Sequence, residues 1–458
     1  MPKIASTNPS RWYSTIGEHE ITQESELISL VQDAKQAQKK WAKFSLLQRK
    51  EKLEKVLHIM KQRKEEIAAL LSEEMGMPIV QAREEMEYGY MYFEWYLKDA
   101  EKFLNPEITR QTDTEIHTVY HEPKGVVAAI APWNYPFSMG IWASIQSLLA
   151  GNAVIFKTSK ETILTWAALE ACFKDAGFPR WVFQEIYGPG SLGEALVRQD
   201  IDFITFTGST RVGKNLYKIA AEKFISCVME LGGSAPGIVC EDADIDAVIE
   251  TIYFLRYSNS GQMCDGLKRL IVHESRYDEV VKKLKDIIES KKVGIAREET
   301  TDVGPLVSQD QLHTLQHQYQ DALQKWAQVL AQAKLDPNLD GAYFALILLW
   351  NISFDMSVWK EEVFWPILPI VKFSTLEQSI ELGNDTEYGL WGYVFTQNKD
   401  TFHYIAQELQ TWAVQLNTLN YCIPESPFGW YKNSGIGREH GRWGFHECCN
   451  VKVLSERK

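Results

Sequence analysis

The sequence predicts an α/β fold in which parallel sheets are covered by helices on both faces. Strand and helix signals alternate in two regions, at residues 126–224 and again from near Gly232 to residue 416. Strands that alternate with helices in this way form parallel sheets. Ligands of such sheets bind beyond the carboxyl ends of the strands, so the fold class also predicts where a site lies.

The composition is that of a globular protein with two or three domains. The 458 residues are 45% apolar and 24% charged, with a formal net charge of −13 and both signs mixed along the chain. This balance argues against nucleic acid or an anionic membrane as the main partner. The most apolar run, at residues 344–352, is too short to span a bilayer.

The seven cysteines predict a reducing compartment, with the cytoplasm as the default. Their number is odd and no two form a CxxC pair. The opening residues, MPKIASTNPSRWYS, contain no apolar stretch of signal-peptide length. No metal site is predicted, because the spacing of His446, Cys448 and Cys449 matches no standard zinc pattern.

The first hundred residues predict helices. Leu27, Leu30, Val31, Ala34, Ala37 and Trp41 recur at helical spacing, and two charged amphipathic stretches follow at 46–74 and 79–104. HTVYHEP, at 117–123, predicts an extended arm that ends at a proline.

The two alternating regions then supply the strands of the sheets. In the first, strands are predicted at 126–134, 153–159, 182–188 and 203–208, with helices at 137–151, 161–177, 191–199 and 210–224. In the second, the strand signals are IVCEDAD, LKRLIVHES, VFWPILPIVKF and YVFTQN.

One segment, IDFITFTGSTRVGKNLYKIAA, reads as a strand, a glycine turn and a helix. Its GxxxxGK pattern is similar to the phosphate loop of nucleotide hydrolases, but Asn215 stands where that loop needs Ser or Thr for Mg²⁺. The alternative is a dinucleotide-binding turn at Gly208, whose helix start offers backbone N–H groups to an anion. A third interpretation is that the glycines only allow the chain to turn between the strand and the helix.

Three residues could carry chemistry. Cys264 lies between Gly261 and Gly266, as in an accessible turn where a thiol can react, although most such cysteines are buried hydrophobes. Glu230 ends an apolar run before two glycines and could act as a general base. Asn134 follows a predicted strand and could donate an N–H to an oxyanion, or could be a turn asparagine.

Together with these residues, an ordered set of motifs covers essentially the whole chain and closely resembles the aldehyde dehydrogenase superfamily. The length and the C-terminal segment look most like its bacterial succinate-semialdehyde dehydrogenase-like branch. The motifs are APWNYPF, TFTGSTRVGK, MELGG, NSGQMC, EEVF with Pro366, NDTEYGL, and PFG with YKNSGIGREHG.

The resemblance implies a covalent mechanism with NAD or NADP. Cys264, as thiolate, would attack the aldehyde to give a thiohemiacetal, and Asn134 with the Cys264 backbone N–H would hold the oxyanion. After hydride transfer leaves a thioester, Glu230 would activate the water that releases the acid. The positions that match the family's cofactor site are Trp133, Lys157, Ser159, Lys160, Gly208, Ser209, Glu362 and Phe364.

The sequence departs from the family pattern at two kinds of position. Lys160 replaces a glutamate that would repel a 2′-phosphate, so we expect NADP to be tolerated or preferred. Trp365 and Trp430 replace glycines, and we expect the fold to survive if these sites open outward. Other tryptophans at positions that are often small are Trp166, Trp181, Trp391 and Trp412.

By resemblance, the fold comprises a Rossmann-like cofactor domain, an α/β catalytic domain and a small β oligomerisation arm. The expected boundaries are 1–111 with 131–231 for the cofactor domain, rejoined near 417–436, then 232–416 for the catalytic domain and 112–130 with 437–458 for the arm. A homodimer or homotetramer is expected, since an exposed strand edge invites pairing.

Succinate semialdehyde or a related aldehyde is the expected substrate, and Arg256 is one candidate anchor for its carboxylate. Three other functions stay as alternatives: a CoA-acylating enzyme that lacks a water-activating base, a non-catalytic protein on the same fold with a structural or binding role, and a nucleotide hydrolase.

Overall fold

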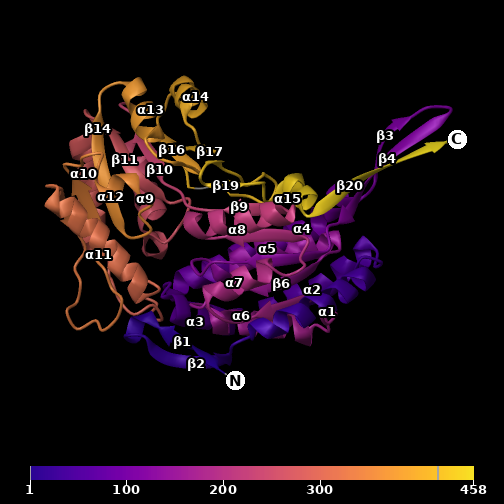
Figure 1. Cartoon of the computed structure of the whole chain (residues 1–458). Coiled ribbons are helices and arrows are strands. Elements are labelled where there is room, and N and C mark those ends of the chain that lie inside the picture. The colour runs from indigo at the N-terminus through magenta and orange to yellow at the C-terminus, as the bar shows by residue number, and fades with distance from the viewer. Residues whose placement is uncertain (1, 420–421) are drawn as a thin grey trace.

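The computed structural model describes residues 2–419 and 422–458, and it confirms the α/β fold (Figure 1). A six-stranded sheet and a seven-stranded sheet form the two main bodies. A three-stranded sheet projects away from them.

The strands of the six-stranded sheet are β5 (Val126–Ile130), β6 (Ala153–Lys157), β7 (Phe183–Ile186), β8 (Phe203–Thr207), β9 (Ser226–Glu230) and β19 (Gly435–Ile436). Their order is β19-β9-β8-β5-β6-β7, and only β19 runs antiparallel. The chain builds β5, β6 and β7 toward one edge and then returns to place β8 and β9 on the other side of β5. The strand order therefore reverses between β5 and β8, which is where open α/β sheets bind ligands.

Helices cover both faces of this sheet because successive strand residues point to opposite sides. Val127 and Ala129 of β5 pack with one set of helices, while Val126 and Ala128 pack with the other. The first set is α2 (Leu46–Gln62), α3 (Lys64–Met75), α4 (Ile79–Leu104), α5 (Pro136–Ala150) and α6 (Ile163–Asp175). The second set is α1 (Leu27–Trp41), α7 (Gly190–Val197) and α8 (Thr210–Lys223).

The seven-stranded sheet has the order β12-β13-β14-β11-β10-β16-β17 and is parallel except for β12. Its strands are β10 (Ala235–Val239), β11 (Leu267–His273), β12 (Gln328–Gln332), β13 (Ile347–Trp350), β14 (Ile367–Phe373), β16 (Trp391–Phe395) and β17 (Ala413–Leu416). The helices of this region are α9 (Ile245–Tyr257), α10 (Tyr277–Ser290), α11 (Gln309–Gln324), α12 (Ser357–Lys360), α13 (Leu376–Asn384) and α14 (Lys399–Glu408).

The prediction of helices alone for the first hundred residues is wrong at the N-terminus. β1 (Lys3–Asn8) and β2 (Ser14–Glu20) form an antiparallel hairpin there. Both strands are short and largely polar, so they lack the apolar alternation that marks a strand. Ser10, in the connection between them, accepts from the Tyr343 hydroxyl at 3.0 Å and from the Ala296 N–H at 3.2 Å, which ties the hairpin to distant parts of the chain.

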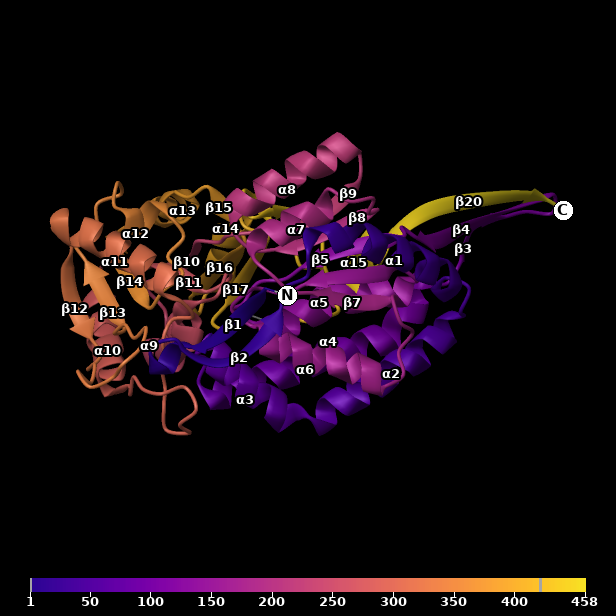
Figure 2. The same ribbon diagram turned by 60° about the horizontal axis from the view of Figure 1, so that its bottom comes forward.

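The projecting sheet has the order β20-β4-β3, from β3 (Glu107–Gln111), β4 (Glu115–Pro123) and β20 (Cys449–Arg457), and it extends from the body in both ribbon views (Figures 1 and 2). We call these three strands the arm. Residues 112–130 and 437–458, where an arm was expected, contain β4 and β20, whereas Val126–Ile130 pairs within the six-stranded sheet. The division into domains stays a prediction, and Asn420 and Tyr421, within its 417–436 segment, lie outside the described residues. The remaining elements are α15 (Gly441–Glu447), β15 (Tyr388–Gly389) and β18 (Tyr431–Lys432).

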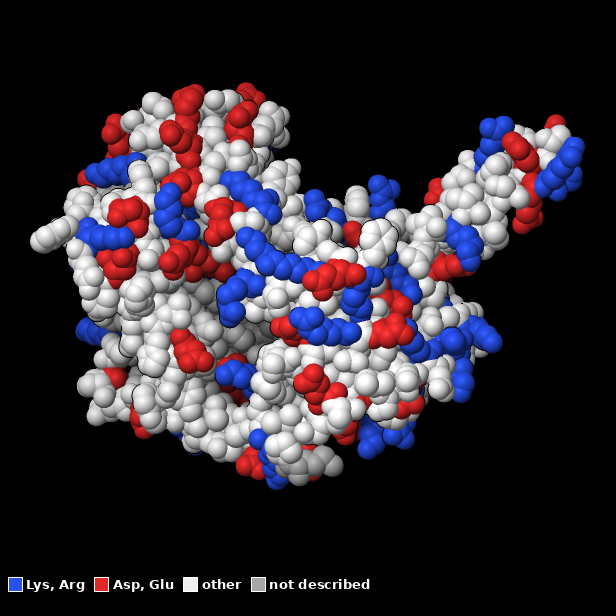
Figure 3. Space-filling view, viewed as in Figure 1, with Lys and Arg blue, Asp and Glu red and all other residues white. Residues whose placement is uncertain are grey.

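Acidic and basic side chains are interspersed over the face of the molecule seen in Figure 3. Within residues 2–419 and 422–458, no helix is long and apolar enough to cross a membrane. The same residues contain no group of three or more His, Cys, Asp or Glu side chains that could hold a metal ion.

Trp365 and Trp430 do not open outward, the condition under which the fold was expected to survive, because each is only 3% exposed. The fold instead holds both rings inside. Neither has a positive φ, so neither backbone position requires glycine. The Trp365 indole donates to Gln318 Oε1 at 3.0 Å and packs with side chains beside the seven-stranded sheet. The Trp166 ring packs directly against Gly140. A Cβ there would lie 1.6 Å from the ring, so the absence of a side chain at Gly140 provides the space for the indole.

Candidate active site

A long groove crosses the carboxyl ends of β5, β6 and β8. It consists of a cavity of about 860 Å³ and a second of about 230 Å³. Both are lined by the residues just after β5 and β8, so the two cavities form one continuous groove; the shared residues are Pro132, Trp133, Thr207, Gly208, Ser209 and Gln311. All eight residues predicted to bind the cofactor line this groove: Trp133, Lys157, Ser159, Lys160, Gly208, Ser209, Glu362 and Phe364.

The start of α8 faces this groove and can hold a phosphate. Gly208 and Ser209 connect β8 to the helix, and no side chain caps its first N–H groups. Uncapped N–H groups at a helix start bind anions. The hydrolase alternative is not supported, because Gly213 lies inside α8 and is buried against Leu231, so GxxxxGK does not form a phosphate loop.

Two lysines mark the far end of the groove. Lys157, at the end of β6, is 3% exposed and donates to the Thr158 carbonyl oxygen. Burial lowers the pKa of Lys157 to about 8, although the negative charge of Glu185 acts to raise it. Lys160 is exposed and forms an ion pair with Glu161 at 3.4 Å. Arg211 lines the same cavity, so this end of the groove offers two exposed cations.

Glu362 and Phe364 lie at the other end, near Cys264. Glu362 accepts from the Gly233 N–H at 3.0 Å and lies 4.0 Å from Lys268 Nζ. The Phe364 ring stands edge-on to the Trp133 ring at 5.7 Å, and Lys268 Nζ lies 4.6 Å from its centre. Lys268 was not singled out from the sequence, since a lysine opening an apolar strand resembles a surface residue.

The turn that carries Cys264 is held in an unusual conformation. Asn259, Ser260 and Gly261 all have φ between 49° and 75°, in the left-handed region. A Cβ on Gly261 would lie 2.7 Å from the Trp365 backbone, so only glycine fits there. Such strain persists where surrounding contacts fix it. Here the Asn259 side chain donates to the Asn134 carbonyl oxygen at 2.9 Å, and its backbone N–H donates to Gln81 Oε1 at 2.8 Å.

Cys264 and Glu230 form the centre of the site. The Glu230 carboxyl, at the end of β9, lines the same cavity as the Cys264 thiol and lies close enough to shift its pKa. Loss of hydration raises the pKa of the thiol well above its ordinary 9.0, and the charges of Glu230 and Asp265 add to this. Burial likewise raises the pKa of Glu230. The carboxyl neighbours of Cys264 therefore favour the protonated thiol in the free protein.

Asn134 lies beside this pair. It is 6% exposed, follows β5 and lines the groove together with Cys264. Its side-chain N–H donates to the Gln262 carbonyl oxygen at 3.1 Å, two residues before Cys264. The amide is thus fixed next to the thiol, where a donor can meet an oxyanion.

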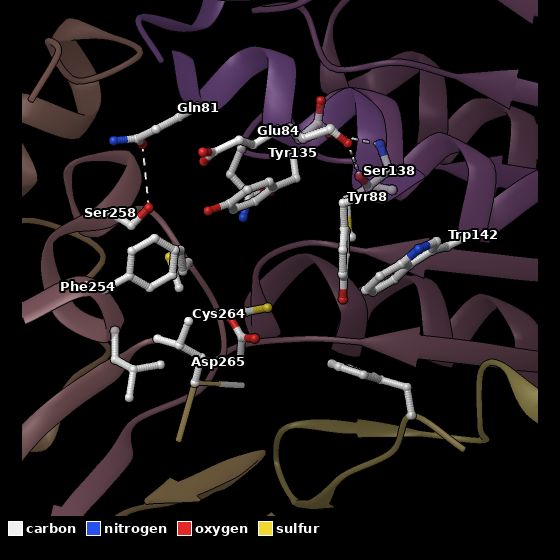
Figure 4. A pocket seen from close by; sticks show the side chains of 17 residues that line it. Gln81, Glu84, Tyr88, Tyr135, Ser138, Trp142, Phe254, Ser258, Cys264 and Asp265 are labelled. Carbon is white, nitrogen blue, oxygen red and sulfur yellow. Dashed lines mark hydrogen bonds between the residues drawn. The ribbon is translucent and has the colours of Figure 1, made fainter. Parts of the chain in front are cut away.

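A further cavity of about 320 Å³ approaches Cys264 from the other side (Figure 4). We call it the α4 cavity, because α4 supplies Gln81, Glu84, Glu85 and Tyr88 to it. It shares Asn134, Met139 and Cys264 with the groove, so the thiol is reached from both sides. Arg256, proposed as a carboxylate anchor, does not line it. The guanidinium is buried and donates to the backbone oxygens of Val363, Trp365 and Ile367.

Comparison with known proteins places this arrangement in a family. Residues 2–454 match the description "Aldehyde dehydrogenase family". A succinate-semialdehyde dehydrogenase [NADP(+)] of Deinococcus radiodurans is 30% identical over 98% of this chain and 96% of its own length. Aminoaldehyde dehydrogenase 1, peroxisomal, of Pisum sativum is 33% identical over 99% of this chain and 92% of its own length.

Solved structures agree with these sequence matches. The NAD⁺ complex of an aldehyde dehydrogenase from Bacillus cereus superposes with a TM-score of 0.95 and 30% identity, covering 100% of this chain and 93% of that chain. The class of protein that the fold and the thiol site define is thus an oxidoreductase acting on aldehydes. The chain belongs to the aldehyde dehydrogenase family.

Proposed function

We propose that this protein oxidises an aldehyde to the carboxylic acid with NAD or NADP, through a thioester on Cys264. The observation that carries the proposal is the position of Cys264, where a dinucleotide-sized groove meets the α4 cavity. A thiol reached from both sides can bond to an aldehyde carbon on one side while a cofactor lies on the other.

The residues of the groove suit a dinucleotide. The α8 start offers N–H groups to a pyrophosphate, Lys157 and Glu362 are the candidates for the two riboses, and Phe364 with Trp133 provides an aromatic wall near the thiol. A nicotinamide held against that wall supplies an acceptor for the two electrons and hydrogen of the aldehyde carbon.

Glu230 and Asn134 have distinct roles in the proposed reaction. Glu230 takes the proton of the Cys264 thiol as sulfur bonds to the aldehyde carbon, because its carboxyl lies next to that thiol. Asn134 and the Cys264 backbone N–H donate to the oxygen that becomes negative. Once the thioester has formed and Glu230 has released the thiol proton to solvent, Glu230 removes a proton from water. Attack of that water on the thioester carbon breaks the bond to sulfur and releases the acid, and the Glu230 proton returns to the Cys264 sulfur.

The alternatives have less support. Glu230 favours water as the acceptor of the acyl group, whereas a CoA-acylating enzyme needs no such base. A purely structural role does not explain why Cys264, Glu230 and Asn134 converge at the junction of two cavities.

The substrate is proposed by class. The names of the two relatives give substrates whose far ends carry opposite charges, a carboxylate in succinate semialdehyde and an amine in an aminoaldehyde. Succinate semialdehyde stays a test substrate from the sequence resemblance. We further infer that the protein works in the cytoplasm, from its odd cysteine count, and as a homodimer or homotetramer, from its arm.

The test is the reduction of NAD⁺ and NADP⁺, followed by the absorbance of the reduced nicotinamide, with a panel of aldehydes. We expect Cys264→Ala to abolish reduction and Cys240→Ala, a matched buried cysteine away from the site, to retain it. Glu230→Gln should slow both the formation of the thioester in a first turnover and the release of the acid, because the carboxylate accepts a proton in each step. Reduction that persists in Cys264→Ala would exclude the thiol mechanism.

A further inference from the structure

The α4 cavity is lined by acidic side chains and, among the described residues, by no basic ones. Glu84, Glu85 and Asp265 line it, and no lysine, arginine or histidine is among its described lining residues. A substrate that ends in a carboxylate would meet these groups without a counter-charge. Like charges in a partly desolvated cavity oppose binding, and opposite charges favour it.

Glu85 lacks a partner on one oxygen. The residue is 3% exposed, and its Oε1 accepts from the Ser138 N–H at 2.8 Å. Its Oε2 is buried without a hydrogen-bond partner. A buried carboxylate oxygen without a partner is unfavourable unless a ligand supplies a donor or a positive charge. Burial raises the pKa of Glu85 to about 8, and a nearby cation would lower it again.

The apolar walls of the cavity are largely aromatic. Tyr88 and Trp142 stand 6.1 Å apart between ring centres, and Trp142 lies 5.6 Å from Phe428. Tyr135 and Phe254 also line it. Figure 4 shows the rings of Tyr88, Tyr135, Trp142 and Phe254 in the cavity with Cys264 and Glu84. Faces of aromatic rings attract cations, and quaternary ammonium groups in particular are bound by such rings.

We propose that the aldehyde oxidised at Cys264 carries a positive charge at its far end, as an ammonium or quaternary ammonium group. The proposal rests on the proposed function, because it concerns the substrate of the same thiol. The aldehyde carbon lies at Cys264, and the cationic end lies among Glu84, Glu85 and the aromatic walls.

The experiment compares three aldehydes of similar length that differ in the charge of the far end. These are 4-(trimethylammonio)butanal, whose quaternary nitrogen cannot cyclise onto the aldehyde, the anion succinate semialdehyde, and neutral pentanal. We expect kcat/KM to be at least about tenfold higher for the cation than for pentanal, and lowest for the anion.

Substitutions in α4 test whether the carboxylates of Glu84 and Glu85 cause a preference for the cationic aldehyde. In Glu84→Gln and Glu85→Gln, the ratio of kcat/KM for the cation to that for pentanal should fall by about tenfold. Glu87→Gln is the matched control, since Glu87 is exposed on the same helix, pairs with Lys64 and does not line the cavity. Its ratio should equal that of the unaltered protein.

The outcomes separate the two proposals. Oxidation of pentanal with succinate semialdehyde preferred over the cation would overturn the cationic substrate and leave the aldehyde oxidation in place. A cation preference that survives in both Glu84→Gln and Glu85→Gln would also overturn it. Failure to oxidise any of the three aldehydes, in folded protein, would count against the proposed function itself.

Discussion

Cys264 is surrounded by carboxyl groups, so its reactivity in the free protein should depend on pH in an unusual way. Alkylation by iodoacetamide requires the thiolate, and burial with the nearby charges holds the thiol pKa above its ordinary 9.0. We therefore expect the alkylation rate to keep rising through that pH without a plateau. The measurement is the second-order rate constant across an alkaline pH series.

Asp265 provides the control for this pH profile. Its pKa is raised to about 6 by burial, so the carboxylate is charged throughout the alkaline range. Asp265→Asn removes that charge, and the midpoint of Cys264 alkylation should then move to lower pH. If the alkylation rate of the unaltered protein reached a plateau at or below pH 9.0, the carboxyl-rich surroundings of Cys264 would not raise its pKa as described.

Lys160 should decide part of the choice between the two cofactors. It lines the far end of the groove with Arg211, and an exposed cation there attracts a 2′-phosphate. We expect Lys160→Glu to lower kcat/KM for NADP⁺ by about tenfold and to affect NAD⁺ much less. Lys214→Glu, on the same α8 as Arg211 but outside the groove, is the charge-matched control. An unaltered protein with a strong NAD⁺ preference would contradict the hypothesis.

At the scale of single residues, the sequence singled out side chains that lie together in the structure, but it did not predict the charges around them. Asn134, Glu230 and Cys264 lie together, and the eight cofactor residues line the adjoining groove. Gln81, Glu84, Glu85 and Tyr88 were not predicted, although their spacing of three, four and seven places them on one helix face. That spacing also describes any amphipathic helix, so the sequence alone cannot tell a cavity wall from a core.

Among the elements, α11 ends in a way that its sequence does not favour. Trp326 follows the helix with a φ of 71°, and its N–H bonds to Leu323 while that of Ala327 bonds to Ala322. This hydrogen-bond pattern is a Schellman motif, whose left-handed position is usually a glycine. The indole is 80% exposed, so little packing compensates for the strain.

Glycine should therefore have opposite effects at two tryptophans. We expect Trp326→Gly to raise the free energy of unfolding by about 1 kcal/mol. Trp365→Gly should lower it by about 3 kcal/mol or more, because that indole is buried. Chemical denaturation measures both, and Trp326→Ala, which keeps the Cβ, should gain less than Trp326→Gly. Stabilisation by Trp365→Gly would contradict the buried packing.

The elements that escaped prediction differ in what their sequences lack. The β1–β2 hairpin is largely polar and is held by long-range contacts, such as those of Ser10 with Ala296 and Tyr343. The strands β12 and β13 are only five and four residues long, and their local signal is therefore brief. The strands β5, β6, β8, β10 and β11 were predicted because burial on both faces makes them rich in apolar and β-branched residues. Local sequence therefore marks most of the central strands, although not β9, whereas tertiary contacts hold the N-terminal hairpin.

For the whole molecule, the arm should control assembly. Val451 and Val453 lie on one face of β20 and are 62% and 57% exposed. Apolar side chains on an exposed sheet face favour burial against another subunit. We expect sedimentation velocity to show a dimer or tetramer, and the double variant Val451→Asp, Val453→Asp to sediment as a smaller species. Lys452→Ala, between them on the opposite face, should leave the assembly unchanged, and a monomeric unaltered protein would contradict the proposed assembly.

Because Cys264 is reached from two cavities, the two products of a turnover can be released separately. In the proposed reaction we expect the acid to leave through the α4 cavity and the reduced dinucleotide through the groove, because Cys264 lines both cavities. Neither departure has to wait for the other. The acid should then compete with the aldehyde, and the reduced dinucleotide should compete with its oxidised form, because each product occupies only the cavity of its own precursor.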